Sequence, residues 1–362
     1  MATGDQSFNR YRLSSSLILV AKIGESNKNE NYEILMIKRS DQTATIKDQC
    51  VFPGGLFESA DESEDWLAYF KEFGVQYSDL RNLCPNDTVP RPNILITPVD
   101  TKVRREISTR INAIRETFEE VGVLLCCSRQ KWSGIPKSHR PASFKYDFDK
   151  DDWQERVHND PREFLIMCQK LQVIPDLWSL YEWAAWASPP TVRKANETVF
   201  FITFLSEKPM VKIELSEAKD FLWETPREYL RLKKKDVIGF WPPQYFELSR
   251  LYMEKSFDKL LRFSYQRRHM GVVLFMHAIH TCTDGTVSVL PGDDMYPKDP
   301  RSLLKPRKLD ITMEQFRQQT KRICRIENVI SLQPKIHINV QPVCGQLMPW
   351  TRNEDELQKS SL

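Results

Sequence analysis

The first hundred residues alternate between apolar runs rich in β-branched residues and short polar segments. The runs 14–23 (SSSLILVAKI) and 32–40 (YEILMIKRS) are joined by GESNKNEN, a Gly- and Asn-rich segment typical of a hairpin connection. A third short strand is expected in 49–55 (QCVFPGG), whose Pro-Gly-Gly end can bring backbone close to a ligand.

From Arg104 to Val121 the apolar positions repeat with a helical period. At about 100° per residue one face of this helix is apolar, and an acidic cluster lies roughly opposite. The apolar face comprises Ile111, Ile114, Phe118 and Val121. The acidic cluster comprises Glu116, Glu119 and Glu120.

The rest of the chain mixes strand and helix signals. A short apolar run lies over 123–127, and a helix is expected over 161–172. A buried strand is expected at 198–205, followed by a strand that leads into a helix over 219–236. One long helical stretch is expected over 240–263. A hairpin is expected over 271–296, with Asp284-Gly285 in its turn.

Composition narrows the class of protein. At 362 residues, with 41% hydrophobic and 28% charged residues, the chain is expected to be soluble and globular. A formal net charge of +3 does not favour general binding to nucleic acid, and no apolar run reaches the roughly 20 residues of a membrane span. Without a secretory signal or a Cys-x-x-Cys spacing, the eight cysteines are interpreted as reduced, mostly buried thiols.

The acidic cluster needs an explanation, because like charges at i,i+3 and i,i+4 destabilise a helix unless a cation lies between them. One interpretation is a solvated helix face. The other is a divalent cation, and oxygen-only ligands suit Mg²⁺ or Mn²⁺, which bridge carboxylates to substrate phosphates. Arg115 precedes Glu119 by four positions and is expected to orient that carboxylate. His277 and His280 are expected on opposite faces of a strand and do not suggest a metal pair.

The segment 115–123 (RETFEEVGV) matches the second half of the Nudix box, and the chain resembles that superfamily. FPGGLFESAD, upstream, supplies Gly55 and then Asp61, where the box has glutamate. The box has seven residues between this acid and the arginine, whereas 53 residues separate Asp61 from Arg115. About 46 residues are therefore inserted. We predict that 62–103 is a surface excursion beside the substrate cleft, where it tunes recognition.

The peroxisomal coenzyme A diphosphatases of the Nudix motif 19 type carry an insertion of this size at this place. Three further segments resemble them: 183–205, with Glu197 in place of an aspartate, 240–251 and 284–296. The resemblance implies a Nudix α/β/α sandwich with a mixed sheet over 10–230. A mixed α+β extension over 231–350 would pack on it, followed by a flexible tail over 351–362.

The resemblance also implies the site. Residues holding Mg²⁺ or Mn²⁺ would be Gly54 or Gly55 through a backbone carbonyl, Glu116, Glu119 and Glu120. One of these glutamates or a nearby acid would deprotonate the attacking water, and spacing does not decide which.

Residues 35–55 resemble a second motif of coenzyme A diphosphatases. The spacing from Arg39-Ser40 to 52–55 is kept, but the second arginine of the motif is Ala44 and its glycine is Asp48. Coenzyme A (CoA) or acyl-CoA is therefore the expected substrate, cleaved to 3′,5′-ADP and (acyl-)4′-phosphopantetheine. Expected substrate contacts are Lys38, Arg39, Lys47 and Phe52.

Other interpretations stay open. The substrate could be an RNA cap, ADP-ribose or NADH, with a base stacked on tryptophans that otherwise belong to the core. These are Trp178, Trp183 and Trp186. A non-catalytic Nudix binding module is a third reading. No membrane or stable nucleic-acid partner is expected. The terminal Ser360-Ser361-Leu362 resembles the peroxisomal address, which implies an import receptor, with the cytoplasm as the alternative location.

Overall fold

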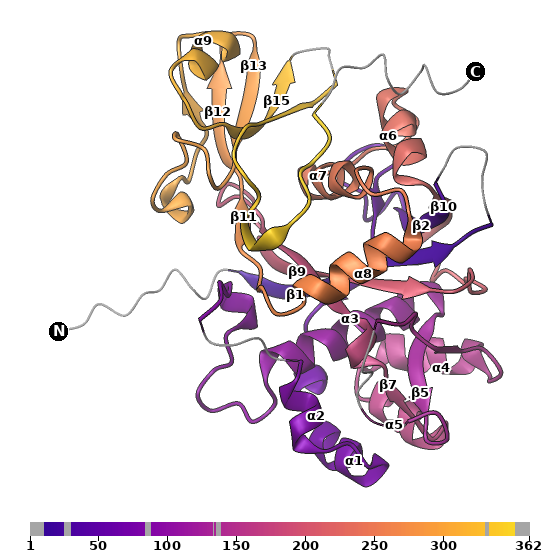
Figure 1. Cartoon of the computed structure of the whole chain (residues 1–362). Helices are drawn as coiled ribbons and strands as arrows, with labels where there is room; N and C mark the ends of the chain where they lie inside the picture. Colours follow the sequence, from indigo (N-terminus) through magenta and orange to yellow (C-terminus); the bar gives the residue numbers. More distant parts are fainter. Residues whose placement is uncertain are drawn as a thin grey trace.

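A central mixed sheet organises the computed structural model, which describes residues 11–24, 30–83, 88–132, 134, 139–329 and 333–351 (Figure 1). Within these residues the sheet has the order β10-β2-β1-β9-β8-β11, with β3 paired to β2 and β4 to β1. β1 pairs in parallel with β9 and β8 with β11, whereas the other pairings are antiparallel. The strands are β1 (Arg12–Lys22), β2 (Tyr32–Arg39), β3 (Cys50–Val51), β4 (Gly54–Leu56), β8 (Tyr181–Ala187), β9 (Asn196–Leu205), β10 (Ala218–Glu224) and β11 (Leu274–Met276).

Helices cover both faces of this sheet, which confirms the predicted α/β/α sandwich. Alternate residues of β1 point to opposite sides, so Leu17 and Leu19 join one apolar cluster and Ile18 and Val20 another. The first cluster packs under α1 (Asp65–Phe73), α2 (Tyr77–Arg81), α3 (Arg105–Val121), α4 (Lys150–Asn159) and α5 (Glu163–Lys170). The second packs under α6 (Pro226–Lys234), α7 (Pro242–Leu251) and α8 (Phe257–Arg267).

Two smaller sheets complete the fold. One has the order β6-β5-β7, formed by β5 (Leu124–Ser128), β6 (Phe144–Lys145) and β7 (Val173–Pro175). The other has the order β14-β12-β13-β15-β16 and packs with α9 (Met313–Gln318) around its own apolar cluster. Its strands are β12 (Ala278–Cys282), β13 (Gly285–Val289), β14 (Arg307–Lys308), β15 (Cys324–Val329) and β16 (Lys335–Ile338).

Most predicted elements are confirmed, with two changes in the C-terminal half. The helical stretch over 240–263 is two helices, because the chain leaves α7 after Leu251 and Ser256 caps α8 by accepting a hydrogen bond from the Lys259 amide. The hairpin is formed by β12 and β13 alone. The apolar residues just before it, Leu274–Met276, pair with β8 in the central sheet.

The predicted surface excursion over 62–103 is wrong. Trp66, Phe70 and Phe73 on α1, together with Ile94 and Leu95, are buried in the same apolar cluster as α3. Their spacing of three or four residues makes one apolar helix face, which packs on the core. The insertion is therefore part of the hydrophobic core on the α3 side of the sheet.

The boundary predicted near residue 230 stays a prediction. α7 and α8 pack on the same face of the central sheet as α6, and a separate apolar cluster includes Ala278 and Cys282.

The described cysteines are free thiols, six of them buried, as predicted. No helix within the described ranges combines the length and the apolar character needed to cross a bilayer. The predicted tail lies outside the described residues beyond Thr351.

Candidate active site on helix α3

The helix that carries the acidic cluster is buried on every side. All residues of Arg105–Val121 are buried, including the three glutamates, and the helix ends at Gly122 with a left-handed φ of 67°. A solvated acidic face is therefore excluded as the explanation of the cluster. Because buried carboxylates need partners, the contacts of each one define what the site can do.

Arg115 is the common partner of the carboxylates around it. Its Nη1 donates to Glu119 Oε1, as the i,i+4 spacing predicts, and its Nη2 lies 3.0 Å from Glu116 Oε1. Its Nε and Nη2 also donate to the two oxygens of Asp61 at 2.8 and 2.9 Å. One guanidinium therefore holds three carboxylates in fixed orientation.

Asp61 is the acid that precedes the insertion in the sequence. It is 1% exposed, and its Oδ2 also accepts hydrogen bonds from the Glu58 amide and from Asn112 Nδ2, at 2.9 and 3.1 Å. Asp61 and Arg115 thus meet although 53 residues separate them. The insertion separates the two halves of the motif in the sequence, but the two halves lie together in the fold.

The Pro-Gly-Gly loop lies directly against the glutamates. The Gly54 amide donates to Glu120 Oε2 at 2.6 Å. A Cβ on Gly55 would overlap the carboxylate of Glu116, and one on Gly54 would overlap the backbone of Ser15. Glycine is required at both positions, and Gly54 also has a φ of 149°. The structure thus brings Gly54, Gly55 and the glutamates together, as predicted.

The protonation of these glutamates is strongly shifted. Burial raises the pKa of Glu116 to about 8, and the nearby charges of Glu119 and Asp61 oppose the lowering effect of Arg115. Burial likewise raises the pKa of Glu119, and it raises the pKa of Glu120 well above its ordinary value, with Glu116 and Glu217 adding to the effect. The cluster holds more carboxylate than the cations around it can neutralise.

The donor set suits a hard divalent cation, although its side chains are turned to protein partners here. Among the described residues, no three His, Cys, Asp or Glu side chains converge as ready ligands. Glu119 faces Arg115 and Glu120 faces the Gly54 amide. Carboxylate and carbonyl oxygens are the ligands of Mg²⁺ and Mn²⁺, and the glycine cradle leaves room for no side chain of its own. These residues fit such an ion.

The predicted substrate contacts fall into different environments. Arg39, at the end of β2, has a buried Nε without a hydrogen-bond partner, and its charge lowers the pKa of Glu120, so it lies near the acidic cluster. Lys38 instead pairs with Asp48 at 3.2 Å. Lys47 is exposed. Neither lysine makes a described contact with the glutamates.

Phe52, predicted as a substrate contact, lies in the core. Its side chain is 2% exposed and packs edge-on against Phe200 in the core on the α7 side of the sheet. Asp48, which replaces a glycine of the motif, has a φ of 49°. That left-handed conformation explains the glycine preference, and aspartate is one of the residues that tolerate it. The hydrogen bond from Lys38 lowers the pKa of Asp48.

The tryptophans proposed as base-stacking residues belong to the core. Trp183 and Trp186 are 1% and 2% exposed, and the indole Nε1 of each donates to Glu247 at 2.8 Å. Trp178 is 7% exposed and donates to the Asp79 carbonyl. Glu197, which stands for an aspartate of the family, accepts hydrogen bonds from the Ile94 amide and from Arg301. It links the insertion to the C-terminal region.

Several residues around the glutamates were not predicted from the sequence. Glu217, just before β10, raises the pKa of both Glu116 and Glu120 by its charge. His158 on α4 lies 3.8 Å from Glu119 Oε2, and Gln154 donates to the Glu119 carbonyl. They come from segments that follow the motif by 30 to 100 residues and carry no recognisable spacing to it. Only the folded chain brings them there.

An α/β/α sandwich with one acid, one arginine and three glutamates gathered beside a Gly-Gly loop defines a Nudix hydrolase. A family model described as the NUDT19 Nudix domain matches residues 11–251, and a second, described as the NUDT19 C-terminal domain, matches 279–339. The chain belongs to the NUDT19 family of Nudix hydrolases.

The chain is also similar to individual relatives and to a solved structure. The chain is 32% identical over 350 residues to the acyl-coenzyme A diphosphatase NUDT19 of Xenopus laevis, covering 92% of this chain and 90% of that protein. For the Homo sapiens protein of the same name the identity is 31%, over 88% and 87% of the two chains. A NUDIX hydrolase structure from Alicyclobacillus acidocaldarius has a TM-score of 0.49 and 17% identity, covering 72% of this chain and 97% of that one.

Proposed function

We propose that the protein hydrolyses the diphosphate linkage of CoA or acyl-CoA to 3′,5′-ADP and (acyl-)4′-phosphopantetheine. The observation that carries this proposal is the buried cluster in which Arg115 joins Asp61, Glu116 and Glu119 beside Gly54-Gly55. The relatives that match along most of both chains are named acyl-coenzyme A diphosphatases, which supports this substrate class.

The cluster would bind Mg²⁺ or Mn²⁺ through Glu116, Glu119, Glu120 and a backbone carbonyl of Gly54 or Gly55. Such an ion supplies Lewis acidity and neutralises charge at the attacked phosphate. Arg115, itself paired with Asp61, contacts Glu116 and Glu119 and fixes where these carboxylates lie. The water-activating base is a carboxylate of this group, and Glu217 is included among the candidates because its charge acts on Glu116 and Glu120.

Arg39 is the proposed phosphate contact. Its buried Nε has no hydrogen-bond partner, and it lies near enough to Glu120 to lower the pKa of that residue. A guanidinium in this position can donate to a phosphate oxygen next to the cluster. Lys47 is exposed on the same loop and can reach an anionic substrate, whereas Lys38 already pairs with Asp48.

Peroxisomal location is part of the same proposal. It rests on the terminal Ser360-Ser361-Leu362, which lies outside the described residues, and on the import receptor that reads such tails. A fluorescent protein fused to the N-terminus leaves this tail free. Signal that coincides with a peroxisomal marker and becomes diffuse on removal of Leu362 is expected. Diffuse signal from both fusions would place the enzyme elsewhere.

The substrate assignment is tested by comparing turnover of CoA, an acyl-CoA, ADP-ribose, NADH and capped RNA, with Mg²⁺ or Mn²⁺ present. Mass spectrometry of the products identifies the bond that breaks. We expect 3′,5′-ADP and 4′-phosphopantetheine from CoA, with a kcat/KM at least tenfold above that for the other substrates. If the enzyme prefers ADP-ribose, NADH or capped RNA, that compound replaces CoA as the proposed substrate. If none of the tested compounds is turned over, the protein is a binding module.

A further inference from the structure

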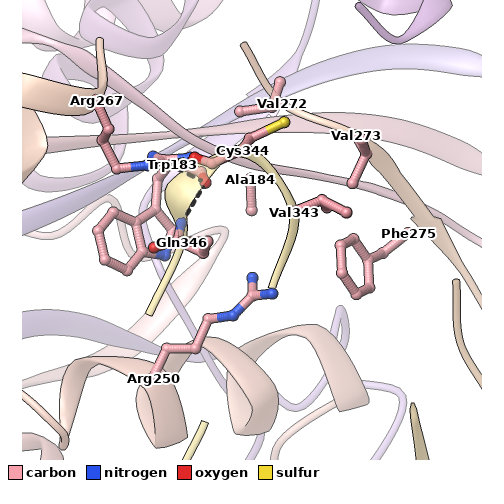
Figure 2. A pocket seen from close by; sticks show the side chains of 10 residues that line it. All are labelled: Trp183, Ala184, Arg250, Arg267, Val272, Val273, Phe275, Val343, Cys344 and Gln346. Atoms are coloured by element: carbon pink, nitrogen blue, oxygen red, sulfur yellow. Dashed lines mark hydrogen bonds between the residues drawn. The ribbon is translucent and has the colours of Figure 1, made fainter. Parts of the chain in front are cut away.

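A second cluster of buried charge lies on the other face of the central sheet, beside a small pocket. The pocket lies between β8, the segment leading into β11 and the segment 343–346 (Figure 2). Most of its wall is apolar, with Ala184, Val273 and Phe275 among the lining side chains. The pocket is narrow and partly open to solvent. One monatomic ion or one water molecule fits that space.

Arg250 is the charged group that faces this space. It is 2% exposed, and its Nη1 contacts both oxygens of Glu247 at 3.0 and 3.2 Å. Its Nε is buried and has no hydrogen-bond partner. Figure 2 shows the guanidinium end directed toward Gln346 and Val343 across the pocket. A buried donor without an acceptor is costly.

The local charges do not balance. Glu247 accepts hydrogen bonds from Trp183 and Trp186 as well as from Arg250, so its lone pairs are used. Arg267, 3% exposed, also lines the pocket, but it donates only to carbonyls in the described contacts, those of Glu182, Trp183 and Cys344.

The charge of Glu182 raises the pKa of Arg267, but the Glu182 carboxylate makes no described contact with that guanidinium. It forms ion pairs with Arg91 and Arg110. The pocket is therefore flanked by two buried guanidiniums and one carboxylate, Glu247. Burial and the neighbouring charge of Arg250 lower the pKa of Arg267 to about 10, as expected for cations that lack a full set of counter-charges.

Two acceptors beside the pocket are already occupied. The Trp183 carbonyl accepts from Gln346 Nε2 at 2.8 Å and from Arg267 Nη1 at 3.4 Å. Gln346 Oε1 accepts from the Leu347 amide at 2.9 Å. A water molecule needs acceptors for its own hydrogens, whereas an anion needs only donors. The open positions of this pocket match an anion.

We propose that the pocket binds one small inorganic anion of about the size of chloride, held by Arg250 between β8 and the segment 343–346. The anion would supply the missing counter-charge and so stabilise the packing of the C-terminal segment on the Nudix fold. It lies on the face of the sheet opposite α3 and takes no part in hydrolysis.

The first test is thermal unfolding of the full chain at constant ionic strength, with sodium gluconate replaced stepwise by sodium chloride. Wild-type protein is expected to gain about 2–4 °C in Tm with a saturable dependence on chloride. Arg250→Gln should lose this gain. Because that variant leaves Glu247 unpaired and can fold poorly, Ala184→Val serves as a second variant that fills the pocket and keeps every charge.

In Ala184→Val the chloride-dependent gain is expected to vanish, while CoA hydrolysis stays within twofold of wild type. Crystals grown in sodium bromide give the direct readout, since bromine scatters anomalously. An anomalous peak beside Arg250 is expected in wild type and not in Ala184→Val. Equal Tm in gluconate and chloride, an equal gain in Ala184→Val, or a pocket without bromide signal would each overturn the proposal and leave water as the occupant.

Discussion

The two faces of the central sheet bury charge of opposite sign. On the α3 face, Arg115 contacts three carboxylates and Glu120 lies beside them, so negative charge is in excess. On the α7 face, Arg250 and Arg267 flank a pocket with Glu247 alone as the contacting carboxylate, so positive charge is in excess. Both clusters are almost fully buried.

The comparison shows how buried charge separates structural pairing from ligand binding. A balanced buried pair, such as Arg325 with Asp293 at 2.7 Å, neutralises its own charge. An unbalanced cluster costs free energy until a counter-ion arrives. The α3 and α7 faces each carry an unbalanced cluster, and the signs of the two differ. We infer that the acidic one binds a divalent cation for catalysis and the basic one a small anion for stability.

The largest effect is expected from removing charge from the acidic cluster. Glu120→Gln keeps the shape of the side chain and the contact with the Gly54 amide but removes the charge, so kcat for CoA should fall about 10³-fold. The measurement is steady-state kinetics with Mg²⁺, together with circular dichroism to verify the fold. Glu155→Gln, an exposed glutamate on α4, is the matched control and should retain wild-type kcat. Turnover near wild type in Glu120→Gln would remove Glu120 from the site.

The next effect concerns the inserted segment, which supports the α3 face. Trp66→Ala should lower the free energy of unfolding by about 3–5 kcal/mol, because it empties a core position against Phe70 and Phe164. Urea unfolding measures this loss. Tyr77→Ala, in the same insertion but 75% exposed, should change stability by less than about 0.5 kcal/mol. If both substitutions lowered the stability by equally small amounts, the insertion would not be part of the core.

A smaller effect follows from the raised pKa of Glu116. The pKa of Glu116 is about 8 in the folded protein and near 4.5 in the unfolded chain. The protonated side chain therefore stabilises the fold below pH 4.5, and this contribution is lost as the pH rises through 8. Metal-free protein should therefore lose roughly 2–4 °C in Tm between pH 5 and pH 8 relative to Glu116→Gln. Mg²⁺ should raise the Tm of wild type more at pH 8 than at pH 6. A parallel pH profile for both proteins would contradict the shift.

The smallest effect tests the loop that joins β2 to β3. Ala44 stands where the second motif of related diphosphatases has arginine, so Ala44→Arg should lower KM for CoA about threefold to tenfold with little change in kcat. Gln42→Arg adds the same charge elsewhere on this loop and should leave KM within twofold. If both variants lower KM equally, the effect is general attraction of an anionic substrate and says nothing of position 44.

Motif spacing could predict the core of the site and part of the fold. Glu116, Glu119 and Arg115 are neighbours on one helix, so their geometry follows from the helical period. The Pro-Gly-Gly loop is recognisable because glycine is the residue that fits against a carboxylate. The strands of the central sheet follow from their apolar runs, and the helix over Pro226–Lys234 follows from the proline, which is favoured in the first turn of a helix.

Other features depend on long-range packing that spacing does not encode. The sequence predicts a surface excursion over 62–103, whereas Trp66 and Phe70 place this segment in the core. Phe52 adjoins the Pro-Gly-Gly loop in sequence, yet strand alternation turns its side chain to the opposite face of the sheet. Glu217 reaches the glutamates only because β10 pairs with β2 next to the site.

Manganese binding tests the central claim most directly, because it reports on the acidic cluster without requiring a substrate. Free Mn²⁺ is titrated with protein and followed by electron paramagnetic resonance, in wild type, Glu120→Gln and Glu155→Gln. Saturable loss of the free-ion signal is expected for wild type and Glu155→Gln, with affinity at least tenfold weaker in Glu120→Gln. Equal binding by all three proteins would contradict the assignment of the buried glutamates of α3 as the metal site.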